Sequence, residues 1–114
     1  MTASMDLNAG EQVLGTWTLF YIPPSGSGKY NGKLTVTNQR LHYDAKADAS
    51  LLGVLVSASA KGGFEINKSE IATVDVVKKL LSKKAILTLS DGSKHIFDYG
   101  VMNIDKCVQA IQAR

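Results

Sequence analysis

Short runs of branched and aromatic residues, separated by turn residues, fill most of the chain, and a helical pattern occurs only at its end. The β-type runs are residues 12–22, 32–44 (a hairpin), 51–59, 64–67, 71–77, 85–90 and 93–98. Such spacing is typical of an antiparallel barrel or sandwich and not of alternating βαβ units. We therefore expect a mostly β fold with one C-terminal α-helix.

The first hairpin has a register that its apolar pattern specifies. If residues 38–39 form a two-residue turn, Val36 faces Leu41 across the pair of strands. Leu34 then faces Tyr43, and all four side chains share one face of the sheet. A slip by one residue would mix apolar and polar side chains on both faces, so we expect this register.

The second hairpin turns at Asp91-Gly92, a dipeptide preferred in two-residue type I′ turns. With that turn, Leu87 lies opposite Ile96 and Thr88 lies opposite His95. Both faces then carry apolar groups. We expect one face to line the barrel and the other to lie under the helix, another strand or a partner.

The C-terminal segment predicts a helix that covers part of the core. Asn103 is a suitable N-cap, because its side chain accepts a free N–H of the first turn. Ile104, Cys107, Val108 and Ile111 recur at helical spacing and form one apolar stripe. An open end of the barrel is the expected site for this stripe.

Composition is that of an ordinary globular domain, with 45% apolar and 20% charged residues. We expect one domain over residues 10–114 behind a loose N-terminal segment, residues 1–9. The single cysteine fits a reducing compartment, and no basic region followed by an apolar leader is visible. The uncharged stretch 49–60 is shorter than the about 20 residues needed to span a bilayer. We therefore expect a cytoplasmic protein.

Several motifs follow one another in a familiar order: Gly10-Glu11 before Val13-Leu14, residues 32–43, residues 64–66 with Ile71 and Val74, and residues 87–92 before Phe97. The most specific element consists of Leu34, Thr37, Asn38, Arg40, Leu41 and Tyr43. In this order the motifs resemble the GRAM and bacterial pleckstrin-homology-like families. The resemblance covers the chain from about residue 10 to its end.

The resemblance implies a bent barrel of about seven antiparallel strands, closed at one end by the C-terminal helix. Relatives with this fold bind phosphoinositides or proteins, and some bacterial relatives assemble into rings. The family offers no catalytic residues to carry over. Phosphoinositide-binding members place several Lys and Arg in the first hairpin loop, whereas residues 23–32 here contain only Lys29. We therefore expect no specific inositol phosphate recognition at that loop.

The chain has a net charge of only +3, but it contains one dense basic cluster. It consists of Lys78, Lys79, Leu80, Leu81, Lys83 and Lys84, around a hairpin end. Leucines there can enter a bilayer while each lysine near an anionic surface contributes about 1 kcal/mol. Alternatively, the lysines are solvated and protect a sheet edge while the leucines pack on the barrel. Without interleaved aromatic side chains, the cluster does not indicate a nucleic-acid partner.

A second candidate surface is the uncharged segment around Gly53. Its members are Leu51, Leu52, Val54, Leu55 and Val56. This segment is either an assembly surface that accepts a partner strand or a strand buried in the barrel wall.

No catalytic residue, metal site or cofactor is expected. His42 and His95 are not at metal-ligand spacing, and Cys107 lies on the apolar stripe of the helix. We therefore expect no enzyme but a binding or assembly module that acts through protein–protein contacts, most simply as a homo-oligomer. The alternative is weak peripheral binding to anionic lipid or phosphoinositide surfaces through residues 78–84.

Overall fold

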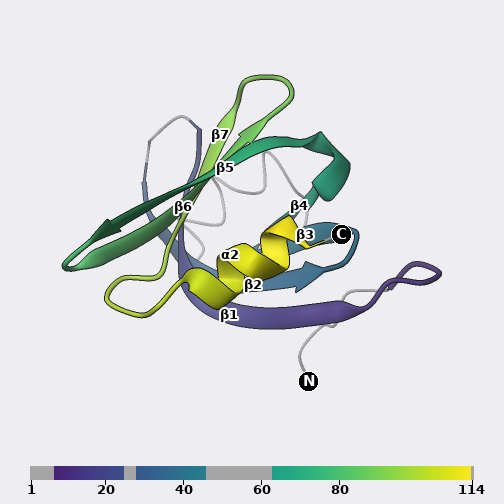
Figure 1. Ribbon diagram of the computed structural model, residues 1–114, viewed down its shortest axis with the longest axis horizontal. Helices are drawn as coiled ribbons and strands as arrows, with labels where there is room; N and C mark the ends of the chain where they lie inside the picture. The colour runs from purple at the N-terminus through teal and green to yellow at the C-terminus, as the bar shows by residue number, and fades with distance from the viewer. Residues whose placement is uncertain (1–6, 25–27, 46–62, 114) are drawn as a thin grey trace.

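The computed structural model describes residues 7–24, 28–45 and 63–113 of the chain. Within these ranges, seven antiparallel strands form one sheet in the order β4-β3-β2-β1-β7-β6-β5. The elements are β1 (Val13–Ile22), β2 (Tyr30–Thr37), β3 (Arg40–Ala45), β4 (Gly63–Asn67), η1 (Lys68–Glu70), β5 (Ile71–Lys79), β6 (Ser82–Leu89), β7 (Lys94–Asp98) and α2 (Asp105–Gln112). The expected mostly β, pleckstrin-homology-like fold with a C-terminal helix is confirmed (Figure 1).

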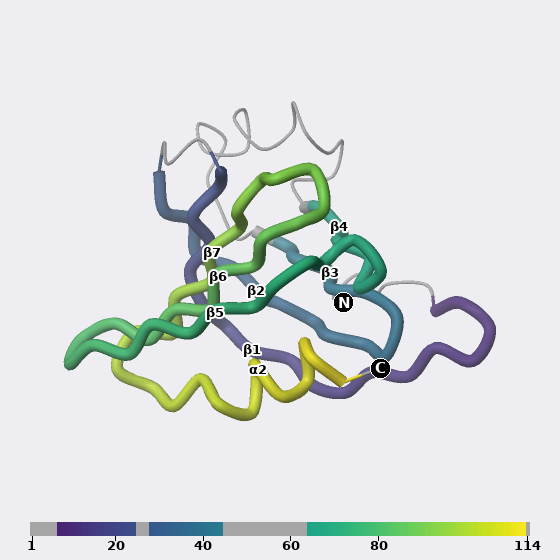
Figure 2. The backbone as a smooth tube through the Cα atoms, turned by 45° about the horizontal axis from the view of Figure 1, so that its top comes forward, coloured from purple at the N-terminus to yellow at the C-terminus, as the bar shows by residue number. Residues whose placement is uncertain are grey.

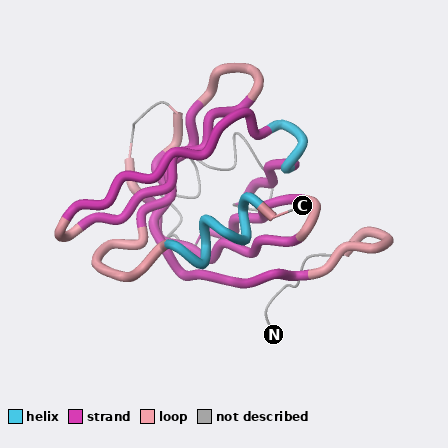
Figure 3. The backbone as a smooth tube through the Cα atoms, in the orientation of Figure 1, coloured by secondary structure: helices cyan, strands magenta, loops and turns pink. Residues whose placement is uncertain are grey.

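The helix α2 joins the two halves of the bent sheet. It contacts β1 and β2 in one half and β5 at the far edge of the other. Figure 3 shows the helix lying across the strands. The N-cap predicted at Asn103 is off by one residue: the N-cap is Ile104, whose side chain makes no capping hydrogen bond. Asn103, one residue earlier, accepts the N–H of Asp105 through its Oδ1 atom at 2.8 Å. This bond satisfies one of the free donors that every helix start exposes.

The core lies between the inner face of the sheet and the helix. Its buried apolar residues are Leu19, Tyr21, Tyr30, Leu34, Val36, Leu41, Tyr43, Ile66, Ala85, Leu87, Leu89, Phe97, Ile104, Cys107, Val108, Ala110 and Ile111. All four members of the predicted helix stripe are among them. Burial of this stripe explains why a helix of only eight residues is stable here, since tertiary packing supplies most helical stability.

The register predicted for the first hairpin is confirmed. Val36 pairs with Leu41 and Leu34 pairs with Tyr43. No residue other than glycine has a positive φ in the described ranges, so the turn at residues 38–39 is not of type I′. Instead, the Oγ1 atom of Thr37 accepts the N–H groups of residues 39 and 40, at 3.0 and 2.9 Å. The threonine hydroxyl thus holds the turn.

An ion pair ties the N-terminal segment to this hairpin. The enclosed carboxylate of Glu11 accepts Arg40 Nε–H at 2.8 Å and the Thr37 hydroxyl at 2.6 Å. Hydrogen bonding from Arg40 holds the pKa of Glu11 at about 2, below its ordinary value. Asn8, which the pattern assigns to a loose segment, donates its side-chain amide to Gln39 at 3.2 Å. Residues 8–11 therefore all contact the first hairpin.

The register predicted for the second hairpin is wrong by one residue. Leu87 pairs with His95, and Ile86 pairs with Ile96. The loop contains residues 90–92 instead of two residues, and Gly92 has a φ of +89°. A three-residue loop of this kind also requires glycine at the left-handed position, so the same dipeptide serves either geometry. His95 consequently lies on the core-facing side, and not on the face that carries Thr88.

Candidate functional site

The basic cluster occupies the end of the β5–β6 hairpin, which projects from the sheet (Figure 1). Lys79 pairs with Ser82, so Leu80 and Leu81 form the turn between the strands. Their exposed fractions are 86% and 73%, the highest of the large apolar residues in the described ranges. The leucines therefore do not pack on the barrel.

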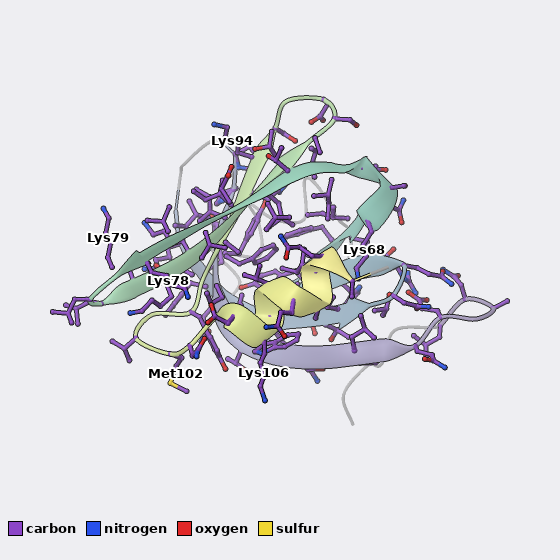
Figure 4. All side chains as sticks on the ribbon, in the orientation of Figure 1. Lys68, Lys78, Lys79, Lys94, Met102 and Lys106 are labelled. Atoms are coloured by element: carbon purple, nitrogen blue, oxygen red, sulfur yellow. The ribbon has the colours of Figure 1, made fainter. Side chains whose placement is uncertain are left out.

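Lysines occupy both faces of this hairpin. Lys78 pairs with Lys83 across the strands, so both lie on one face. Because side chains alternate along a strand, Lys79 and Lys84 lie on the other face. Figure 4 shows Lys78 and Lys79 extending to opposite sides of the hairpin. The exposed leucines thus have positive charge on either side.

A second exposed apolar pair lies beside the hairpin. Val101 and Met102, in the loop between β7 and α2, are 64% and 55% exposed. Figures 1 and 2 show this loop at the same end of the molecule as the hairpin end. We call the two parts together the tip surface: Leu80, Leu81, Val101 and Met102 with Lys78, Lys79, Lys83 and Lys84. We did not predict Val101 and Met102 as part of a binding surface. The one sign of them in the sequence is that two apolar residues follow Gly100.

A pocket of about 230 Å³ separates the hairpin from the loop. Its lining residues are Lys78, Lys83, Val101, Asn103, Ile104 and Asp105. Within it, the Nζ atom of Lys78 lies 2.6 Å from Oδ1 of Asp105. Both side chains of this ion pair are about half exposed, so the pair contributes little to stability.

In the loop between β1 and β2, the positive charge of Lys29 is already paired within the protein. The Nζ atom of Lys29 lies 3.2 Å from Oδ2 of Asp98 and 4.9 Å from the centre of the Phe20 ring. The Asp98 side chain is 3% exposed, and no other lysine or arginine stands between residues 23 and 32. This arrangement favours the hairpin end over the first loop as an anion-binding surface.

The histidines have side-chain partners, and the cysteine is free and buried. His42 Nδ1 lies 3.3 Å from Glu65, and His95 Nδ1 lies 2.7 Å from the hydroxyl of Tyr21. Burial lowers the pKa of His95. Burial also raises the pKa of the Cys107 thiol to about 12, which makes it a poor nucleophile. In the described ranges no three metal-ligating side chains cluster.

The proposed assembly segment is not among the residues described. Leu51, Leu52, Val54, Leu55 and Val56 lie within the stretch 46–62, outside the described ranges. Assembly through that segment stays a prediction.

Comparison with known proteins supports the fold alone. No family model matches the chain, and no curated protein matches it. A crystal structure of the C-terminal domain of an unknown protein from Leishmania infantum is similar, with a TM-score of 0.67 and 18% identity. The match covers 90% of this chain and 83% of that domain. In the described part of the chain, no helix has the length and apolar character to cross a membrane.

Proposed function

We propose that the chain is a non-catalytic, GRAM-like binding module that docks reversibly on anionic membrane surfaces through the tip surface. One observation carries this proposal: four exposed apolar side chains at one end of the molecule have lysines beside them. The cytoplasmic leaflet is the natural target, because its anionic lipids give it a negative surface potential. That target also fits the expectation of a cytoplasmic protein.

The shape of the tip surface favours a bilayer over a protein partner. The leucines stand at the end of a two-stranded hairpin that projects from the sheet, with exposed fractions of 86% and 73%. A bilayer accepts such a protrusion without a complementary shape. Lysine stems also place their methylene groups against the apolar layer while the ammonium groups stay among the head groups.

The expected affinity is weak. Full burial of a leucine side chain contributes about 1.5–3 kcal/mol, so half-burial of two contributes roughly 2 kcal/mol. Lys79, Lys83 and Lys84 add about 1 kcal/mol each near an anionic surface. Lys78 adds less, because Asp105 already pairs with it. The sum of about 5 kcal/mol corresponds to a dissociation constant of the order of 0.1–1 mM in lipid.

Co-sedimentation with liposomes tests the proposal. We expect binding to phosphatidylcholine vesicles that contain phosphatidylglycerol, no binding to pure phosphatidylcholine, and loss of binding as salt increases. Replacement of both Leu80 and Leu81 by Ser is expected to weaken binding at least tenfold. The matched control replaces Val13 and Leu14 by Ser. These residues are 49% and 43% exposed at the start of β1, on the other side of the molecule from the β5–β6 hairpin end (Figure 1). Equal weakening by both variants would contradict the proposal.

A single-charge comparison separates the hairpin end from net charge. Lys79→Ala is expected to weaken binding about fivefold, which corresponds to about 1 kcal/mol. Lys94→Ala removes the same charge from an exposed position on another hairpin and should leave binding within twofold. The competing outcome is self-association: light scattering above 12.2 kDa that disappears in the Leu80/Leu81 variant would assign this surface to protein contacts.

A further inference from the structure

The pocket between the hairpin and the β7–α2 loop has an uneven charge balance. Lys78 and Lys83 lie opposite each other on the same face, and both line the pocket. Like charges placed opposite each other on a sheet are unfavourable unless an anion lies between them. Asp105 supplies one negative charge, 2.6 Å from Lys78. One positive charge in the pocket therefore has no counterpart within it.

That charge belongs to Lys83. Its Nζ atom donates to the backbone carbonyl oxygens of Lys79 and Leu80, at 2.5 and 3.2 Å. These acceptors are neutral, and within the described ranges no carboxylate lies within 4.0 Å of this ammonium group. The carbonyl oxygens hold the Lys83 ammonium group against the hairpin turn, and the Lys83 side chain lines the pocket.

Asp105 occupies the position that an incoming anion would take. Its ion pair with Lys78 is about half exposed, and exposed pairs of this kind are worth about 0–1 kcal/mol. An anion with two negative charges can therefore compete for Lys78 and also neutralise Lys83. Asn103 also lines the pocket with a polar side chain, whose Oδ1 atom accepts the N–H of Asp105.

We propose that this pocket binds the phosphomonoester head group of a membrane lipid, with Asp105 as an internal competitor for Lys78. A phosphomonoester carries about −1.5 to −2 charges at pH 7, whereas a phosphodiester such as phosphatidylglycerol carries one. Lysine ammonium groups are established phosphate ligands that act as point charges. The volume of about 230 Å³ suits a small group, because sites for drug-sized ligands measure roughly 300–1,000 Å³.

A lipid is the favoured source of this group because of the pocket's surroundings. Val101 lines the pocket and is 64% exposed, and Leu80 and Leu81 stand at the adjacent hairpin end. A head group in the pocket would leave its acyl chains next to these side chains. The inference rests on the proposed membrane docking and specifies the lipid class for the same surface.

Vesicles of matched surface charge test this selectivity. We compare phosphatidic acid with phosphatidylglycerol in phosphatidylcholine vesicles adjusted to equal zeta potential. The wild-type chain should bind the phosphatidic acid vesicles about fivefold more tightly, as one additional charge contact would give. Lys83→Gln should reduce this ratio to about one. Lys79→Gln, on the opposite face of the hairpin, should weaken both affinities and leave the ratio unchanged. Asp105→Asn should increase the ratio.

The possible failures are distinguishable. Equal binding to both vesicles, or a ratio that Lys83→Gln leaves unchanged, overturns the pocket assignment while membrane docking stands. Absence of binding to either vesicle overturns docking itself. Glycerol 3-phosphate provides the soluble arm: if it shifts the NMR signals of Lys83 and Asp105 at concentrations as low as the lipid does, the pocket belongs to a soluble ligand and the lipid assignment is wrong.

Discussion

The ion pair between Glu11 and Arg40 makes a prediction about stability that can be worked out from its contacts. Glu11 accepts Arg40 Nε–H at 2.8 Å and Nη2–H at 3.1 Å, and it also accepts the Thr37 hydroxyl and the N–H of Asn8. In Glu11→Gln, one acceptor oxygen becomes an amide donor that faces other donors. The guanidinium also loses the charge that opposes it.

The expected loss of stability in Glu11→Gln depends on the hydrogen bonds that this variant retains. Removal of one partner of a buried ion pair costs about 3–5 kcal/mol. Arg40 keeps its bond to Glu65, at 2.7 Å, and the glutamine keeps one acceptor oxygen. We therefore expect Glu11→Gln to lower the free energy of unfolding by about 2–3 kcal/mol. For a chain of this size the midpoint of thermal unfolding should fall by roughly 8–12 °C.

The pH dependence of the stability provides a second test of the Glu11–Arg40 ion pair. In the folded chain the pKa of Glu11 is about 2, below the ordinary value of 4.5. As the pH falls, the unfolded chain therefore takes up the proton first. The contribution of Glu11 to stability is complete above about pH 4.5 and is lost as the pH falls towards about 2. The difference between wild type and Glu11→Gln should shrink over that window.

Urea unfolding at several pH values between 7 and 2.5 measures both effects. Glu70→Gln is the matched control, since Glu70 is exposed and its side chain accepts a long, 3.4 Å bond from Asn67. That variant should stay within about 0.5 kcal/mol of wild type. A loss in Glu11→Gln as small as in the control would refute the reasoning. So would a difference from wild type that does not change with pH.

Three further predictions concern single positions. Gly92 has a φ of +89°, so Gly92→Ala should destabilise the chain by about 1 kcal/mol in urea unfolding, and an unchanged midpoint would argue against the three-residue loop. Lys68 is buried and its Nζ donates to the carbonyl oxygens of Ala110 and Ala113 at the end of α2. Lys68→Met should therefore speed hydrogen exchange in the last turn of α2, whereas exchange at the wild-type rate would show that other contacts hold this end. Cys107 should react with a thiol reagent only in denaturant, and rapid labelling of the folded chain would contradict its burial.

The sequence predicted the parts of the fold in which two local signals agree. The first hairpin has an apolar period and a short polar turn that specify one register, and that register is present. The helix has an apolar stripe that specifies one face, and that face is buried, although the helix begins one residue later than the predicted cap at Asn103 implies. The register of the second hairpin was predicted wrongly because its glycine fits loops of two or three residues equally well. Apolar residues on both predicted faces left no pattern to separate the two registers.

The candidate site was predictable only in part. The lysine and leucine cluster is contiguous in sequence, but whether the leucines point outward depends on the turn between β5 and β6. Val101 and Asp105 approach the cluster only because β7 and α2 bring residues 99–105 back to the hairpin. No short-range pattern encodes that approach. Thr37 and Arg40, two members of the motif on which the family resemblance depends most, hold the turn and form the ion pair with Glu11.

The depth of the hairpin end in a bilayer tests the account most directly. We would record ¹⁵N–¹H spectra of the chain with phosphatidylglycerol nanodiscs that contain a lipid spin-labelled in its acyl chain. Weak binding in fast exchange should broaden the amide signals of Leu80, Leu81, Val101 and Met102 selectively, and leave those of residues 90–93, in the β6–β7 loop, sharp. Broadening centred on residues 90–93, or no selective broadening while the chain is bound, would contradict docking through the tip surface.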